Sequence, residues 1–139
     1  MQNASLLLLR ISLGGLMVYW GIDKLINVKH GVTVAAKFYG GMSVGNTPMQ
    51  LFGAVQLALG ALIIAGLLRR ISYPALLLVT GATLLAVWKS ILDPFKLVVD
   101  GGNLIFYPSL IIFAGAFVLY AFRDVDTRRP GASGVAHSA

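Results

Sequence analysis

Two groups of polar and aromatic side chains stand at the ends of apolar runs and together could do chemistry. The first group is Trp20 and Lys24, and the second is Trp88, Lys89 and Asp93. An ammonium group can hydrogen-bond a developing oxyanion, and indole rings can wall an apolar ligand. Such a set suits a quinone ring or a small anion. The competing interpretation is that Trp and Lys only anchor helices at the lipid–water boundary.

Two ion pairs could join these groups if their helix ends reach the same membrane surface. Lys24 could pair with Asp93, or Lys89 with Asp23. Either pair would hold a cation, a carboxylate and indole walls in one pocket. We therefore expect a ligand site at one end of a helix bundle.

Two further polar residues lie inside apolar runs. Gln56 shares a helix face with Gly53 and Gly60, so its amide contacts either a neighbouring helix or a ligand, and Gly60 is expected to be structural. Arg10 lies about one and a half turns inside its run and is expected to be a structural anchor. It would reach the head groups, a backbone carbonyl or an aspartate such as Asp124.

The first apolar run carries its charges and glycines in phase. At about 100° per residue, one narrow stripe of a helix holds Arg10, Gly14, Met17, Gly21 and Lys24. A charge exposed to lipid is costly. We therefore expect this stripe to turn inward, with Gly14 and Gly21 as structural packing positions.

The composition is that of an integral membrane protein. Of 139 residues, 58% are hydrophobic and 12% charged, and the mean hydropathy is +0.83. A soluble domain has about twice that charged fraction. The net charge of +6 then indicates contact with anionic lipid rather than nucleic acid. Cysteine is absent, which excludes thiolate catalysis and Cys-ligated metals. Glutamate is absent too, and no metal site is expected.

Four apolar runs are long enough to cross a bilayer as helices. They span residues 4–26, 48–68, 73–92 and 104–122. The sequence therefore predicts an all-α, four-helix membrane bundle as one domain over residues 1–126. The remaining residues, 127–139, are small and polar and predict a flexible cytoplasmic tail. Between the first two runs, either a short interfacial helix or a solvated loop is expected.

The basic residues predict the orientation. With four crossings, every arginine falls on one side of the membrane and every lysine on the other. Arg69 and Arg70 lie in the shortest loop, and the positive-inside rule then places the termini in the cytoplasm.

At this point the first two runs resemble a known family. The segment 9–25, LRISLGGLMVYWGIDKL, and the segment 56–70, QLALGALIIAGLLRR, are similar to the first two spans of the DoxX family. The phrase Arg…Leu-Gly…Gly-x-x-Lys-Leu is the distinctive part. The resemblance implies a multi-pass four-helix bundle in the bacterial cytoplasmic (inner) membrane. The positions that match the family pattern are Arg10, Gly14, Gly21, Lys24, Gly60 and Gly66.

Relatives of this family include a subunit of a thiosulfate:quinone oxidoreductase. The resemblance therefore implies that the chain is a subunit or anchor of a quinone-linked redox system. If the chain has enzymatic activity, it has it only as a subunit of such an oxidoreductase. Many members carry His where this chain has Trp20, which removes a titratable group and disfavours proton-coupled chemistry. A quinone is the candidate cofactor, and no covalently bound one is expected. The electron carrier would be a partner subunit.

Two other functions compete with this hypothesis. The first is a non-catalytic membrane scaffold that binds partner helices or copies of itself. The second is a small-molecule transporter, which would need an oligomer to line a path. In each case the lipid bilayer is a partner and nucleic acid is not.

Overall fold

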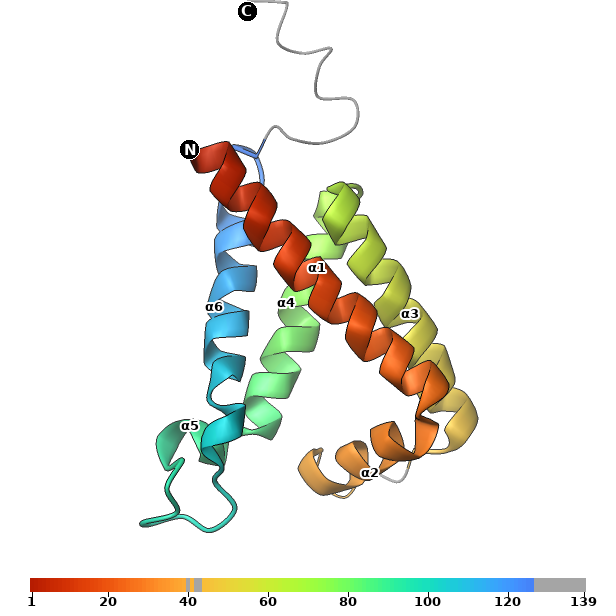
Figure 1. Cartoon of the computed structure of the whole chain (residues 1–139), viewed down its shortest axis with the longest axis vertical. Helices are drawn as coiled ribbons and strands as arrows, with labels where there is room; N and C mark the ends of the chain where they lie inside the picture. The colour runs from red at the N-terminus through yellow and green to blue at the C-terminus, as the bar shows by residue number, and fades with distance from the viewer. Residues whose placement is uncertain (40, 42–43, 127–139) are drawn as a thin grey trace, which may run out of the picture.

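Six α-helices and one 3₁₀-helix make up the described part of the chain, which is residues 1–39, 41 and 44–126 of this computed structural model. No strand occurs among those residues. The helices are α1 (Gln2–Ile26), α2 (Val28–Phe38), α3 (Asn46–Ala65), α4 (Arg69–Ala86), α5 (Trp88–Leu92), η1 (Leu104–Phe106) and α6 (Pro108–Ala121). The all-helical prediction is confirmed, but three short segments accompany the four long helices (Figure 1).

Three helical segments are long and apolar enough to cross a membrane. They are Gln2–Ile26, Asn46–Ala65 and Leu104–Ala121. The other long helix, α4, has the same 18 residues as the shortest of these segments, but it begins with Arg69 and Arg70, whose charges lower its hydropathy. The structure thus bears out three of the four expected crossings by length and composition.

The long helices alternate in direction, so the bundle has two chemically different ends. The start of α1, the α3–α4 turn and the end of α6 lie together at the upper end in Figure 1, and α2 and α5 lie at the lower end. We call the upper end, which holds Arg10, Arg69 and Asp126, the arginine end. The lower end, which holds Lys24 and Lys89, is the lysine end. Cytoplasmic placement of the arginine end stays a prediction.

Glycines bring α1 and α3 into backbone contact. A Cβ added to Gly14 would lie 2.8 Å from the carbonyl oxygen of Gly60, and one added to Gly21 would lie 2.7 Å from that of Gly53. Small residues permit such close approach between membrane helices. The two pairs sit two helical turns apart on antiparallel helices. This contact therefore fixes the register of α1 on α3.

The core runs along the bundle axis and draws on all four long helices. Its buried members are Leu6, Leu13, Met17, Leu59, Ile63, Tyr73, Leu76, Ala116 and Leu119. The outward faces are also apolar, as at Leu78 and Phe117. A helix bundle that is apolar on both its inner and outer faces suits a lipid environment.

The turn between α3 and α4 is tighter than the sequence predicts. The sequence predicts a loop between the runs 48–68 and 73–92, but α4 already begins at Arg69. Gly66 ends α3 with φ +73°, a left-handed conformation that glycine adopts without strain, and Leu67 N donates to the Leu62 carbonyl at 2.9 Å. Because this cap completes the reversal early, Pro74 falls inside α4, near its first turn.

The expected third run, 73–92, is not one helix. It breaks at Val87, after which α5 takes a new direction. The Ser90 hydroxyl accepts a hydrogen bond from Asn103 N at 3.0 Å, which ties α5 to the segment before η1. This tertiary contact, rather than a proline or glycine, accompanies the break.

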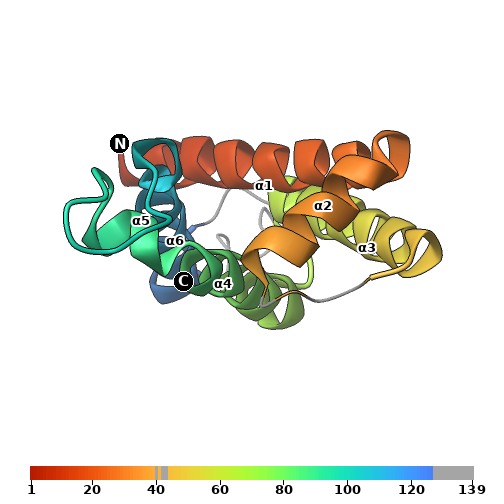
Figure 2. The same ribbon diagram turned by 90° about the horizontal axis from the view of Figure 1, so that it is seen from below.

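Of the two alternatives for the segment between the first two runs, the structure has a short helix, α2, and its interfacial position stays a prediction. Figure 2 shows α2 crossing beneath the bundle from the end of α1 toward α4. Its last residues make the far contacts. Tyr39 and Thr83 share a hydrogen bond at 3.2 Å, and the Phe38 and Phe106 rings meet edge-on at 5.0 Å. The predicted tail at 127–139 lies outside the described residues.

Candidate functional site

Lys24 occupies the lysine end of the contact between α1 and α3. Its ammonium lies 6.0 Å from the centre of the Trp20 ring and 5.3 Å from that of Phe52, both within cation–π range. It also donates to the Trp20 carbonyl at 3.4 Å. The absence of a side chain at Gly53 lets Lys24 lie this close to α3, because a Cβ at Gly53 would lie 2.8 Å from the Lys24 Cβ. A cation thus lies within reach of two aromatic rings at the lysine end of the bundle.

Gln56 lies one turn further along α3 than Phe52 and is 2% exposed. Its amide nitrogen donates to the Met17 sulfur at 3.6 Å, a weak acceptor, while its carbonyl oxygen has no hydrogen-bond partner among the described residues. A buried, unpaired carbonyl is costly. Gln56 therefore offers an acceptor to a ligand or a partner group within the helix pair.

The remaining predicted site residues lie elsewhere. Trp88 is 46% exposed on α5, with the Lys89 ammonium 5.9 Å from its ring centre. Both Figure 1 and Figure 2 place α5 on the opposite side of the molecule from the end of α1. The structure thus brings Trp20, Lys24 and Gln56 to one helix pair and separates Trp88 and Lys89 from them.

Asp93 belongs to that second group and has a structural task. Its carboxylate accepts hydrogen bonds from the backbone N–H groups of Val99 (2.8 Å), Val98 and Leu97 (3.0 Å). These backbone donors stabilise the charged form and lower the pKa of Asp93 below its usual range. Asp93 thereby shapes the loop that follows α5.

Both expected cross-helix ion pairs are wrong. Asp93 turns to the N–H groups of its own loop rather than to Lys24. Asp23 lies 2.7 Å from the Nδ1 atom of His30, on α2, and not against Lys89. Each carboxylate has a partner nearer in sequence, on α2 for Asp23 and in the loop after α5 for Asp93.

A buried ionic cluster closes the arginine end. The Arg10 side chain is buried, at 3% exposure, and its Nη1 lies 2.7 Å from Asp126 Oδ2. Arg69 Nη2 reaches the same carboxylate oxygen at 3.1 Å. The inward orientation expected for Arg10 is therefore what the structure has, but its acidic partner is Asp126 rather than Asp124.

Backbone carbonyls complete this cluster. Arg10 Nε donates to the Ile64 carbonyl at 3.1 Å, and Arg69 donates to the carbonyls of Gly66 (3.0 Å) and Asp126 (2.7 Å). Gly66 leaves room for both guanidinium groups, since a Cβ there would lie 2.8 Å from Arg10 and 2.9 Å from Arg69. The left-handed glycine thus serves both the turn and the cluster.

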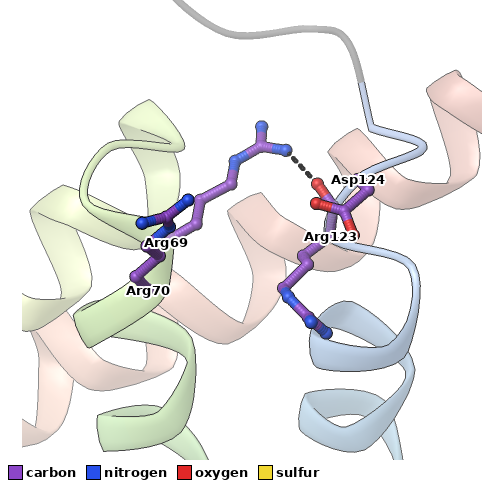
Figure 3. A pocket seen from close by; sticks show the side chains of 4 residues that line it. All are labelled: Arg69, Arg70, Arg123 and Asp124. Carbon is purple, nitrogen blue, oxygen red and sulfur yellow. Dashed lines mark hydrogen bonds between the residues drawn. The ribbon is translucent and has the colours of Figure 1, made fainter.

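A pocket opens beside the cluster. Its lining residues are Arg69, Arg70, Arg123 and Asp124, and its volume is about 440 Å³. Figure 3 shows the Arg69 guanidinium reaching across from α4 to the segment after α6. There its Nη1 donates to the Arg123 carbonyl at 2.7 Å.

Sequence reasoning missed Asp126, Arg69 and Tyr73 as members of the arginine end. The Tyr73 ring lies under Arg69, with 5.7 Å from the guanidinium carbon to the ring centre. One signal was available, because an arginine inside a span requires a counter-charge. Among the described residues, no three His, Cys, Asp or Glu side chains are grouped as metal ligands would be.

Comparison with protein families gives a match to the first part of the chain. The family model described as DoxX matches residues 5–89. The match covers α1 to α4 and therefore includes Lys24, Gln56, Arg10 and Arg69. No curated protein and no solved structure matches the chain.

Proposed function

Because this chain belongs to the DoxX family of membrane proteins, we propose that it is a membrane-embedded subunit of a quinone-linked redox system. In this proposal the quinone head group binds beside Lys24, on the contact between α1 and α3. Partner subunits would carry the electrons.

The observation that carries this proposal is that the Lys24 ammonium lies within cation–π range of both Trp20 and Phe52. Phe52 is 44% exposed, so a lipid-soluble ring can approach it from the bilayer. The ammonium would donate to a quinone carbonyl oxygen and stabilise the negative charge that develops there on reduction. The two aromatic rings would form the apolar walls.

Gln56 extends this set into the membrane. It lies on the same face of α3 as Phe52, and its amide contacts Met17 on α1. Its buried carbonyl oxygen would accept a hydrogen bond from a quinol hydroxyl. A reduced head group would thus have a donor at Lys24 and an acceptor at Gln56.

The test is to extract the full chain in polymer-bounded particles that retain native lipid, and to measure quinone per protein after solvent extraction. The Lys24→Ala variant should lose most of the quinone that the wild type retains. The matched control is Lys37→Ala, because Lys37 is exposed at the same end and its ammonium lies 5.4 Å from the Phe38 ring centre. Equal quinone content in the wild type and the Lys24 variant would refute the proposal.

A non-catalytic scaffold is the second candidate, and the arginine end favours it. There, Arg10 and Arg69 bind Asp126 and backbone carbonyls, so these charges support the fold. For a scaffold, the same particles should contain stoichiometric partner proteins or further copies of the chain, without quinone. Particles that contain a single copy and no other protein would exclude it.

A further inference from the structure

We propose that the pocket at the arginine end binds a phosphate group, and that it does so at the boundary between membrane and water. The pocket is formed by Arg69, Arg70, Arg123 and Asp124. This site lies at the opposite end of the bundle from Lys24, and the proposal does not depend on a quinone-linked role.

The charge of the pocket favours an anion. Its lining carries three guanidinium groups and one carboxylate. Behind Arg69, the buried cluster sets two guanidinium groups, those of Arg69 and Arg10, against the single carboxylate of Asp126. Counted once each among the described residues, the pocket and the cluster hold four arginines and two aspartates, and the buried part of this positive charge is weakly screened by solvent. The resulting positive electrostatic potential attracts an anion to the pocket.

The pocket also has a fixed wall. Arg69 is held by carbonyls on both of the elements that it bridges, at Gly66 and at Arg123 (Figure 3). Arg123 Nη1 donates to the Tyr120 carbonyl at 2.8 Å, and its guanidinium carbon lies 4.5 Å from the Tyr120 ring centre. These groups are positioned before any ligand arrives, which reduces the ordering cost of binding.

Arg70 supplies the adjustable group. Its side chain is exposed, and no hydrogen bond or ion pair to it occurs in the described part of the chain. A guanidinium fork can bind two phosphate oxygens at once, so it suits this ligand better than a point charge does. With a volume of about 440 Å³, the pocket has room for a phosphate and the group esterified to it.

The surroundings place this pocket where head groups lie. Exposed apolar residues are sequence neighbours of its lining arginines, namely Leu68 and Ile71 near the start of α4 and Phe122 after α6. The candidate span Leu104–Ala121 ends directly before Phe122. Basic pockets between helices at this depth bind anionic lipid head groups. The phosphate could equally belong to a small aqueous phosphate ester, and the experiment separates the two sources.

The test uses the full chain in nanodiscs and follows thermal unfolding. One arm compares phosphatidylcholine nanodiscs with and without phosphatidylglycerol. The other arm adds inorganic phosphate to pure phosphatidylcholine nanodiscs, against chloride at equal ionic strength. We expect a higher unfolding temperature in at least one arm. A response to phosphatidylglycerol identifies a lipid phosphate, and a response to inorganic phosphate identifies an aqueous one.

Arg70→Gln should abolish most of that response and weaken binding roughly fivefold, as expected for the loss of one cation near a membrane surface. Arg70→Lys keeps the charge but loses the guanidinium fork, so it should retain part of the rise in unfolding temperature. This variant replaces Arg70→Gln in the test if Arg70→Gln does not fold. The control is Lys37→Gln, which removes an exposed cation at the other end. The proposal is overturned if neither arm responds, if the Arg70 variants respond like wild type, or if Lys37→Gln loses as much.

Discussion

Replacing Asp126 with asparagine tests the ionic cluster most directly. The change keeps the shape of the side chain and removes its charge. In the wild type, one oxygen of this carboxylate lies 2.7 Å from Arg10 and 3.1 Å from Arg69. After the change, both guanidinium groups keep their burial and lose their counter-charge. The backbone carbonyls of Ile64, Gly66 and Arg123 still accept hydrogen bonds from them, but these acceptors carry no charge.

The expected loss is about 3–5 kcal/mol in the free energy of unfolding, the usual cost of removing one partner from a buried ion pair. The matched control is Asp124→Asn, two residues earlier. Asp124 is exposed, so its replacement should change the free energy of unfolding by about 0.5 kcal/mol or less. The comparison also separates the observed partner of Arg10 from the one that the sequence suggested.

The assay is unfolding in detergent micelles by titration with sodium dodecyl sulfate, followed by tryptophan fluorescence. The chain has two tryptophans, Trp20 and Trp88, on different helices. A second measurement uses the double variant Arg10→Gln with Asp126→Asn. Because the double variant no longer buries the Arg10 charge, it should be at least as stable as Asp126→Asn alone. Equal losses for the Asp124 and Asp126 variants, or strict additivity in the double variant, would refute the account of this cluster.

Two further predictions concern the helix contact and the loop after α5. Gly14→Ala should lower the free energy of unfolding by about 1–3 kcal/mol, because its Cβ would meet the backbone of α3. Gly15→Ala should leave that free energy unchanged, because nothing lies within 4 Å of its Cβ. The titration with sodium dodecyl sulfate measures both variants. The pKa of Asp93 is lowered in the folded state, so its stabilisation of the loop is complete above the unfolded value of about 3.9 and disappears as the pH falls through the folded value. In nuclear magnetic resonance, the Val99 amide shift should therefore titrate below about pH 3.9 in the wild type and in Asp100→Asn, but not in Asp93→Asn. A midpoint at or above that pH would contradict the loop geometry.

The lengths of the apolar runs and the helical phase of their polar residues predicted much of the fold. The spacing of Arg10, Gly14, Gly21 and Lys24 put them on one face, and the structure places that face against α3. These inferences depend on local periodicity, which α1 obeys along its whole length. The family match then covers the same segments.

The partner of Arg10 could not be chosen from the sequence. Asp124 and Asp126 both follow the last run, and the short turns after α6 decide which one turns inward. In these turns Val125 N donates to the Phe122 carbonyl at 3.0 Å, and Asp126 N shares that acceptor at 3.3 Å. A shift of one residue in such a turn would point a different side chain at the bundle.

The division of the predicted outer site has a similar origin. Neither glycine nor proline marks the break at Val87, and the new direction of α5 is accompanied by a hydrogen bond between Ser90 and Asn103. Tertiary contacts of this kind override local pattern. Trp88 and Lys89 therefore fall away from Lys24, although the two helix ends share one end of the bundle.

The separation of Arg10 from Asp126 along the chain has a consequence for biogenesis. The two residues are 116 positions apart. At about 5–20 residues per second, the ribosome needs roughly 6–23 seconds to make the second after the first. During that time Arg10 lacks its partner carboxylate. Its guanidinium group therefore has to stay hydrated, at the insertion machinery or near the head groups, until Asp126 has been synthesised. Ribosome stalling before that point would leave a membrane intermediate with an uncompensated cation, which quality-control proteases could recognise.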